Sequence, residues 1–391
     1  MNKDYENAKN GFDNYVEECK NRIKDTFFKD EYLLSLKSLR DNLVNSGKVN
    51  KDISIEEAIK FERLQMIEVK VNHTMRVVED VIRISEKLGT NIDFTNILKI
   101  SALLHDIGRF DQATWNNNFS DSCYKSTKGI NSHAHAGYHI LFNNNRIESF
   151  RINKKFYPAV GSVIYNHGNA ILTGDLALKL NSINELDVNK LTGYYNLNDS
   201  EKIIIAALVQ MVRDVDMLDI LYQNLTGELP VVRDIMTFNV SDNTIIDIAK
   251  YWEIDYEYLL EYNSIEINHT SKTRTINVPV DKINPKKLIV PKDIQERFFR
   301  NEFIDLKELN ARKDWSFITG MWWRLNHFLN NISFTSNLEL VQEKELLDKI
   351  YNKYPEEYKP LVKDAFEFAS EYLLNKRIKE NKNKIYTKSY K

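Results

Sequence analysis

Apolar residues recur at intervals of three and four through most of this sequence, which is the spacing of amphipathic helices. Residues 30–44 carry such a stripe of leucines, and residues 54–89 open with the capping-box pair Ser54 and Glu57 and end at Gly89. An all-α fold is therefore expected. Further helices are predicted at 133–143, 156–167, 200–222, 245–262, 315–330 and 338–351.

Three further stretches give a predicted helix end, a predicted loop and a predicted β-hairpin. Residues 94–108 form an apolar helix for which Gly108 is the expected C-terminal stop. Residues 112–131 are rich in Asn and Ser and predict a polar loop. Residues 264–280 alternate polar and apolar side chains, which predicts a small β-hairpin.

Composition narrows the class of protein. The chain has 391 residues, of which 42% are hydrophobic, so it can bury a sizeable core. Its net charge of -2 gives no general attraction to nucleic acid or to a membrane surface. Two cysteines are too few for a disulfide framework, and no run of about 18 apolar residues occurs. A cytoplasmic protein that does not enter a membrane is expected.

The histidines are unevenly distributed. Six of the eight fall between residues 73 and 167, where even scattering would give about two. His73, His105, His133 and His167 each lie on or beside an apolar helical stripe. A buried polar group must be satisfied by a hydrogen bond or a metal. One such histidine is most simply a hydrogen-bonded core residue, but four of them call for a common cause.

His105 and Asp106 stand side by side at the end of the apolar run in SALLHDIGRFDQ, residues 101–112. Neighbouring residues on a helix point about 100° apart, so the pair can share one ion only near the helix end. Imidazole nitrogen and carboxylate oxygen suit Zn, Mn, Fe, Ni, Co and Mg. The second carboxylate oxygen of Asp106 can bridge to another ion, which needs imidazoles of its own.

These residues carry a resemblance to a known family. His73 in HTMRVVEDV, the pair in LLHDIGRFDQ and an Asp in VRDVDMLDIL resemble the HD-domain metal-dependent phosphohydrolase superfamily, whose motif places them on separate helices. In that family the last Asp begins a D-x-x-D-x-L pattern, which fits Asp216 rather than Asp214. The resemblance implies an all-α HD-domain helical fold with N- and C-terminal helical additions and a small β-hairpin insertion.

The resemblance also suggests a division of the chain. The expected parts are an N-terminal helical segment at 1–53, a metal-binding HD core at 54–223, an insertion with the β-hairpin at 224–300, and C-terminal helices with a basic tail at 301–391. The insertion is expected to act as a lid or as a contact in a homodimer, and the sequence does not separate these two roles.

Members of the family that bind two ions add a His in an H-x-x-x-G segment and another His before a loop. His133, four residues before Gly137, fits the first better than His135 does, and His167 fits the second. The resemblance thus implies two divalent ions held by His73, His105, Asp106, His133, His167 and Asp216. His135 and His139, one helical turn apart, are an alternative ligand pair.

Other side chains are candidates for contact with substrate. Arg109 can hold a phosphate or form a surface salt bridge, and Arg213 can do the same or orient Asp216. His135 and His139 are expected near the mouth of the site, where His135 can donate a proton to the leaving group. With Asp106 as the bridging carboxylate, Arg109 and His135 complete the expected catalytic set.

The expected activity is divalent-metal-dependent hydrolysis of a phosphate ester by a metal-activated water. A nucleotide, a linear or cyclic oligonucleotide, or a related ester is the expected substrate. Two alternatives remain open. The same ligands occur in HD-type di-iron oxygenases, and a sensor or scaffold would keep the metal without turnover.

Overall fold

The computed structural model describes residues 3–29, 33, 36–90, 92–117, 119, 121–126, 130–168, 199–229, 231–232, 235–263, 273–332 and 335–388. The chain divides into two compact units, Met1–Asp219 and Ile220–Lys391. Helices dominate the described residues, which contain one two-stranded sheet, so the predicted all-α fold with a small β element is confirmed. In the described part of the chain, no helix is long and apolar enough to span a bilayer.

The first unit is built from helices. In chain order they are α1 (Lys3–Asp25), α3 (Lys37–Asn45), α4 (Ile55–Leu88), α5 (Ile92–Leu104), α6 (Ile107–Trp115), α7 (His133–Tyr138), α8 (Tyr157–Asn166) and α10 (Asp199–Thr226), whose last turns lie in the second unit. Short turns connect them at η1 (Asp121–Ser126), η2 (His139–Asn143), η3 (Arg146–Phe150) and η4 (Lys154–Phe156).

Helix α4 is the long central element of this unit. Ser54 and Glu57 form the predicted capping box at its start, and Gly89, with φ of 62°, ends it in the left-handed conformation. One face buries His73 together with Val77 and Val81. The periodicity of the sequence therefore sets the direction of His73, which points from α4 into the core of the unit.

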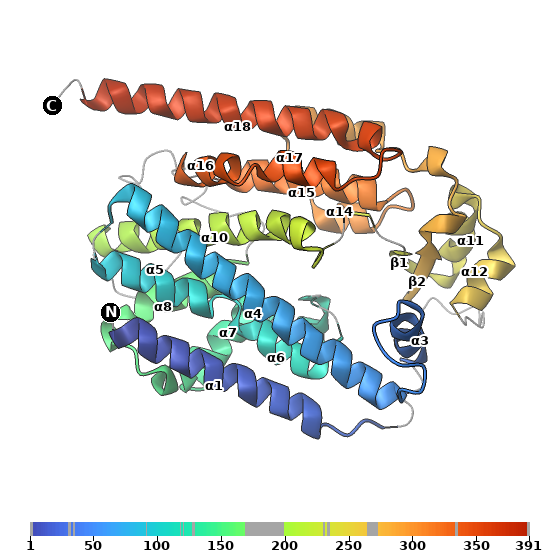
Figure 1. Cartoon of the computed structure of the whole chain (residues 1–391), viewed down its shortest axis with the longest axis horizontal. Helices are drawn as coiled ribbons and strands as arrows, with labels where there is room; N and C mark the ends of the chain where they lie inside the picture. Colours follow the sequence, from blue (N-terminus) through green and yellow to red (C-terminus); the bar gives the residue numbers. More distant parts are fainter. Residues whose placement is uncertain are drawn as a thin grey trace. The chain divides into compact units, whose positions relative to one another are not determined.

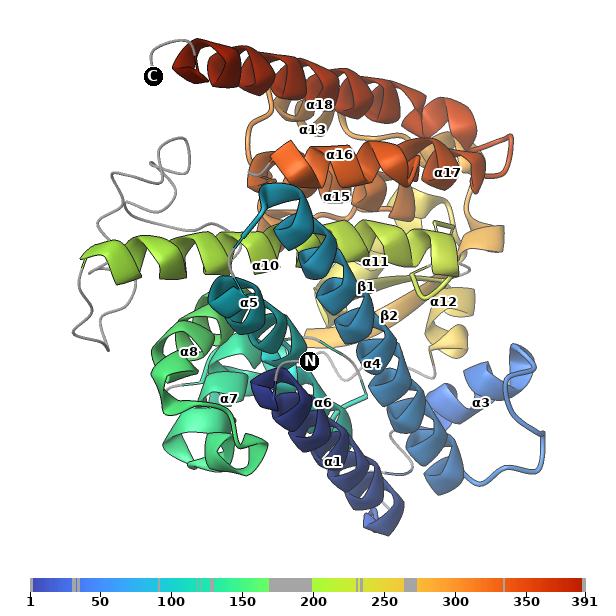
Figure 2. The ribbon, with the colours of Figure 1, turned by 60° about the vertical axis from the view of Figure 1, so that its left-hand side comes forward.

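The other helices of the first unit pack around α4. Contacts join α4 to α1, α5 and α6, and contacts among α5, α6, α7 and α8 complete the group. Figure 2 shows these four helices gathered to the left of α4, with α1 alongside α6. The segments that carry His105, Asp106, His133 and His167 are thereby collected on one side of α4.

Gly108 does not end a helix, contrary to the prediction. Helix α5 ends at Leu104, and α6 begins at Ile107 after a two-residue turn, so that Gly108 lies in the first turn of α6. A Cβ at this position would lie 2.8 Å from the backbone nitrogen of Gly137. The glycine is required for close approach of α6 to α7 and not for a left-handed cap.

The second unit contains the sheet and the C-terminal helices. In chain order its elements are β1 (Ile235–Ser241), α11 (Asp242–Trp252), α12 (Tyr256–Tyr262), β2 (Thr273–Pro279), η7 (Val280–Lys282), η8 (Pro285–Lys287), α13 (Lys292–Phe299), α14 (Leu306–Asn310), α15 (Phe317–Asn331), α16 (Thr335–Glu343), α17 (Leu346–Asn352) and α18 (Lys359–Lys388). In Figure 1, α15, α16 and α17 lie along α18, and contacts join each of α15, α16 and α17 to α18.

The stretch 264–280, predicted to form a small β-hairpin, contains one of the two described strands. Strand β2 falls within that stretch, but its antiparallel partner is β1, from Ile235 paired with Pro279 to Ser241 paired with Thr273. Residues 264–272 lie outside the described part of the chain. Every second side chain is buried on each strand, Met236 and Phe238 on β1 and Ile276 and Val278 on β2. In the sequence the two paired strands are separated by α11 and α12.

The helix predicted at 245–262 is divided. Glu253, with φ of 58°, ends α11, and the side chain of Asp255 accepts a hydrogen bond from the backbone of Tyr258 to start α12. A residue other than glycine in the left-handed region is an uncommon helix stop, so periodicity alone predicts one continuous helix.

The division of the chain into four parts, and the lid or dimer role of residues 224–300, stay predictions.

Candidate metal centre

The His105–Asp106 pair forms the turn between α5 and α6. Asp106 starts α6, but its carboxylate makes no capping hydrogen bond to that helix and is 3% exposed. Because Gly108 lacks a side chain, α6 approaches the first residue of α7, and a Cβ on Gly108 would lie 2.1 Å from the carbonyl oxygen of His133. The local sequence therefore brings the Asp106 carboxylate to the imidazole of His133.

Four donor atoms meet on one side of Asp106, and we call this group the His73 half. Nε2 of His73 lies 3.3 Å from Nε2 of His105, 3.4 Å from Oδ2 of Asp106 and 3.2 Å from Oδ1 of Asp216. Nε2 of His105 lies 3.7 Å from the same oxygen of Asp106 and 3.8 Å from that of Asp216. Two helices, α4 and α10, and the turn between α5 and α6 thus bring these four atoms together.

The other oxygen of Asp106 faces a second group, the His133 half. Its Oδ1 lies 3.5 Å from Nε2 of His133 and 3.5 Å from Nε2 of His167. These two nitrogens are 3.1 Å apart. His133 is the first residue of α7, and His167 directly follows the last residue of α8. Asp106 therefore connects two donor groups through its two oxygens.

The spacing of these atoms fits metal ions. Donors that surround one ion at about 2.1 Å lie about 3.0–3.4 Å apart in octahedral or tetrahedral geometry. Most of the distances in both halves fall in or just above that range. His73, His105 and Asp106 form one potential ligand group, and Asp106, His133 and His167 form another. Asp216 adds a fourth donor to the first.

Two carboxylates outside the donor groups orient one histidine in each half. Nδ1 of His73 donates to Asp219 at 2.7 Å, and Asp219 in turn accepts two hydrogen bonds from Arg76. In the other half, Nδ1 of His133 donates to Asp121 at 3.0 Å, and Asp121 also accepts from Nη1 of the Arg109 guanidinium at 3.0 Å. Each arginine holds the carboxylate that orients an imidazole. The network repeats in both halves.

Backbone carbonyls orient the remaining two histidines. Nδ1 of His105 donates to the carbonyl oxygen of Ala102 at 2.6 Å, and Nδ1 of His167 donates to that of Ile164 at 2.7 Å. With their Nδ1 protons held in this way, all four imidazoles can present an unprotonated Nε2 to the donor groups, as metal-ligating histidines do. The chemistry of this donor set fits divalent ions such as Zn, Mn, Fe, Ni and Co.

Charge in the His73 half favours proton retention in the absence of an ion. Burial and the Lys70 ammonium lower the pKa of His73, but three neighbouring carboxylates raise it to about 10. Burial raises the pKa of Asp106, yet Lys70 and the nearby imidazoles bring it well below its ordinary value. The pKa of Asp216 is also lowered, because hydrogen bonding from His73 outweighs burial.

The His133 half has the opposite tendency. Burial, together with the Arg109 guanidinium, lowers the pKa of His133 to about 4 despite its hydrogen bond to Asp121. Burial also lowers the pKa of His105 to about 4, so one imidazole of the His73 half behaves in the same way. At neutral pH these imidazoles are neutral ligands that are ready to bind an ion.

Lys70 is a site residue that the sequence analysis did not single out. It lies on α4 one turn before His73, and its Nζ is 2.5 Å from Oδ2 of Asp106. Its side chain is 15% exposed, compared with 3% for Asp106, so it reaches the centre from the rim. The three-residue spacing from His73 was the signal for this position.

Asp219 and Asp121 were also missed. Asp219 is the second Asp of the D-x-x-D-x-L pattern that starts at Asp216, so the motif itself contained the signal. Asp121 belongs to η1, within the stretch expected to be a polar loop, where no periodicity points to a buried partner. Its role depends on the tertiary contact with His133.

The two arginines predicted to contact phosphate are engaged by protein groups. Besides Asp121, Nη1 of Arg109 donates to the carbonyl oxygen of Phe119 at 2.6 Å and to Gln112 at 2.9 Å. Arg213 is 4% exposed, donates to Gln210 at 3.4 Å, and has its pKa lowered to about 10 by burial. Both guanidiniums are placed to orient other residues.

His135 and His139 lie on the α7–η2 segment and belong to neither donor group. The ring of His135 stacks on Tyr165 with centroids 4.2 Å apart, and burial lowers its pKa. His139 begins the π-helical turn η2 and is partly exposed. The structure therefore brings together the six ligands named from the sequence and leaves this alternative pair outside the cluster.

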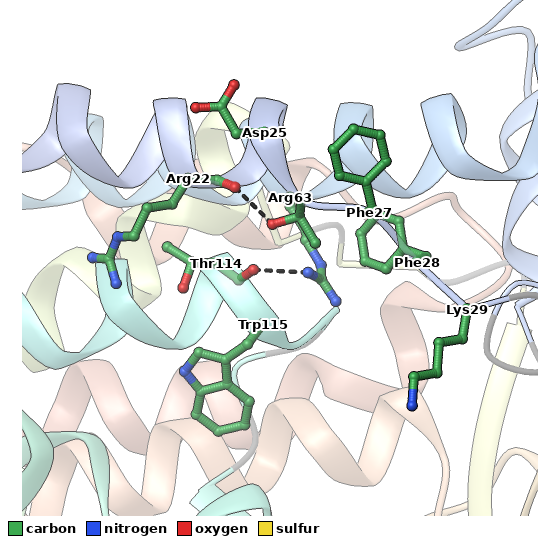
Figure 3. A pocket seen from close by; sticks show the side chains of 9 residues that line it. Arg22, Asp25, Phe27, Phe28, Lys29, Arg63, Thr114 and Trp115 are labelled. Atoms are coloured by element: carbon green, nitrogen blue, oxygen red, sulfur yellow. Dashed lines mark hydrogen bonds between the residues drawn. The ribbon is translucent and has the colours of Figure 1, made fainter.

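The cavities on the surface of the first unit are separate from this cluster. One of about 660 Å³ lies between the end of α1, the segment after it, α4 and α6. Figure 3 shows its Arg63 donating to the carbonyl oxygen of Thr114, at 2.7 Å. Arg22 in the same wall pairs with Asp111 at 3.0 Å. Another cavity, of about 550 Å³, lies beside the end of α4, and no donor residue of the cluster lines either one.

Comparison with protein-family models matches residues 71–208 to the HD domain. The match contains five of the six clustered residues, and Asp216 follows eight residues after its end. Comparison with curated proteins and with solved structures gives no match. The sequence motif, the helical fold and the geometry of the cluster agree with the family model. Residues 71–208 of the chain are therefore identified as an HD domain.

Proposed function

We propose that this protein is a phosphohydrolase that depends on two divalent ions and cleaves a phosphate ester. The observation that carries the proposal is the position of Asp106, whose two oxygens face two separate groups of imidazoles. A carboxylate with this placement is suited to bridge two ions. The proposed substrate is a nucleotide, a linear or cyclic oligonucleotide, or a related phosphate ester.

The protein's own residues would hold and orient the ions. His73, His105 and Asp216 would hold one, His133 and His167 the other, and Asp106 both. When bound, two such ions supply a nucleophilic hydroxide at neutral pH and neutralise charge on the phosphoryl oxygens. The chain then needs no side-chain nucleophile, and its part is to keep the imidazoles aligned.

The surrounding residues divide into positioning and contact roles. We assign Arg109 to positioning, because its Nη1 is held by Asp121, Gln112 and a backbone carbonyl. Arg213, which is buried, has the same kind of role on α10. The lowered pKa of His135 disfavours proton donation at neutral pH and favours contact with substrate through its stacked ring.

A di-iron oxygenase is the second candidate, favoured by the same donor set of four imidazoles and two carboxylates. Iron accepts these ligands as readily as manganese or zinc does. A metal-binding sensor or scaffold without turnover is the third. The three candidates differ in what the metal-loaded protein consumes and releases.

The test begins with metal analysis of protein purified without added metal. The protein is then assayed for phosphate or nucleotide release from nucleoside mono-, di- and triphosphates and from linear and cyclic dinucleotides, with Asp106→Ala as the inactive control. Release by the wild type alone supports the proposal. Two irons with oxygen consumption and no release would replace it with the oxygenase. Full metal occupancy with neither reaction would favour the sensor.

A further inference from the structure

Lys70 places a positive charge at the atom that an ion in the His73 half would use. Its Nζ lies 2.5 Å from Oδ2 of Asp106. The same oxygen is 3.4 Å from Nε2 of His73 and 3.7 Å from Nε2 of His105. The ammonium and an ion in this half would therefore compete for one carboxylate oxygen.

Buried charge explains why such a lysine is useful. The His73 half contains two carboxylates, of which Asp106 is 3% and Asp216 17% exposed at the side chain. Two buried carboxylates without a counter-charge strongly destabilise a folded protein. An ammonium from the rim supplies that counter-charge when no ion is present.

The same ammonium also lies over an aromatic ring. The ring of Phe119 is 5.4 Å from Nζ of Lys70, and the guanidinium carbon of Arg109 is 5.8 Å from the same ring. The Phe119 carbonyl oxygen accepts a hydrogen bond from Arg109, which fixes the backbone at this point. The face of an aromatic ring attracts a cation, so Lys70 can move off Asp106 while keeping a favourable contact.

We propose that Lys70 is the built-in counter-cation of the metal-free centre. It occupies Oδ2 of Asp106 until an ion binds in the His73 half, and the ion displaces the ammonium toward the ring of Phe119. The two cations repel each other across one oxygen, so Lys70 weakens ion binding while it stabilises the metal-free fold. This inference rests on the metal-binding part of the proposed function and is independent of the reaction.

The first test uses Mn²⁺ alone, titrated into metal-free protein by calorimetry. Lys70→Met keeps an unbranched side chain that is one atom shorter and removes its charge. It should bind Mn²⁺ about tenfold more tightly, the order of effect that one neighbouring charge has on a buried ionic equilibrium. Its metal-free form should melt below the wild type, and its Mn²⁺-loaded form should melt at the same temperature as the loaded wild type.

Two matched variants control for other effects. Lys70→Arg keeps the charge and should bind Mn²⁺ as the wild type does. Lys60→Met removes a lysine from the same helix, where Lys60 pairs with Glu56 away from the donor groups, and should not change the affinity for Mn²⁺. Unchanged or weaker Mn²⁺ binding by Lys70→Met would overturn the proposal. Absence of Mn²⁺ binding in the wild type would overturn the proposed function as well.

A second measurement needs no variant. An amine-reactive label, read by mass spectrometry, should modify Lys70 faster in the Mn²⁺-loaded wild type than in the metal-free protein, because the ion releases the ammonium from Asp106. Labelling of Lys60 serves as the internal reference and should not respond to Mn²⁺. Equal labelling of Lys70 with and without Mn²⁺ would show that it is not displaced.

Discussion

The two halves of the cluster share Asp106 but differ in charge. The His73 half adds Asp216 and Lys70, and its His73 has a pKa raised to about 10. Within the described part of the chain the His133 half has no further carboxylate donor, and the pKa of His133 is lowered to about 4. An ion must therefore displace positive charge to enter the first half but then meets two carboxylates. In the second half it meets the neutral imidazole of His133, the imidazole of His167 and a single carboxylate oxygen.

The difference teaches that two ion positions built from similar ligands need not be equivalent. More carboxylate charge favours tighter binding of a divalent cation. The His73 half should therefore hold its ion more strongly once loaded, and the His133 half should exchange its ion more readily. The predictions below test that order.

Removal of Asp106 should have the largest effect, since it belongs to both halves. Asp106→Ala is expected to lose both ions and all metal-dependent activity. Metal analysis after dialysis, together with the phosphate-release assay, measures the two losses. Retention of one ion per chain would mean that Asp106 does not connect the halves.

Variants that remove a ligand from only one half should show which ion each half holds. His167→Gln is expected to keep the ion of the His73 half, whereas Asp216→Asn should lose that more tightly held ion. Competition with a chelator of known affinity ranks what each variant retains. If His167→Gln lost the stronger ion and Asp216→Asn the weaker one, the proposed order of the halves would be reversed.

The orienting carboxylates provide a matched pair. Asp219→Asn should weaken ion binding in the His73 half, and Asp121→Asn should weaken it in the His133 half, each by about 10- to 100-fold. Both side chains accept a hydrogen bond from an imidazole Nδ1, so an amide replaces the same contact in each case. Equal losses at both ions in either variant would indicate general disruption of the fold.

The metal-free protein should lose stability in acid because of its neutral imidazoles. The pKa of His133 is about 4, below its ordinary 6.5, so the unfolded state takes up the proton first as the pH falls. The stabilisation is complete above pH 6.5 and is lost toward pH 4, at up to about 1.4 kcal/mol per pH unit for each such histidine.

Denaturant unfolding of the metal-free wild type and of His133→Gln, measured between pH 7 and pH 4, tests this expectation. The variant should show the shallower decline, because one of the buried neutral imidazoles has been removed. His105, whose pKa is also about 4, should account for part of the slope that remains. Identical slopes would mean that His133 is not held neutral in the metal-free protein.

The smallest effect is expected at His135. His135→Ala removes a ring that stacks on Tyr165 outside the donor groups, so the variant should keep both ions. Any change should be in the Michaelis constant of the phosphate-release assay. Loss of one ion would instead make His135 a ligand in place of His133.

The sequence predicted the cluster because each ligand lies on an apolar stripe or at a helix end, where spacing sets direction. His73 follows from the face it shares with Val77, and the Asp of the distant motif follows from its pattern. That these residues bind metal, and which ions they bind, stay predictions. The fold class was predicted for the same reason, since helical spacing is a local property.

What the sequence did not predict depends on contacts between distant segments. Lys70 was missed because its spacing from His73 shows which face of α4 it lies on, but not which residue its long side chain reaches. Asp121 was missed because the polar stretch around it has no hydrophobic periodicity from which the direction of a side chain could be predicted. The pairing of β2 with β1 was not predicted, since strand pairing joins residues far apart in the chain, here across two helices. Gly108 was mistaken for a helix stop because close packing and a left-handed turn both require glycine.

The contact of Gly108 with the first turn of α7 has a consequence for how this site can change. The distance between the two halves is set by the backbone contact of α6 with α7 at Gly108, and not by side-chain rotamers. Loops around the mouth can vary in length and sequence without altering that dimension. A single methyl group at residue 108 would alter it, although that residue belongs to neither donor group.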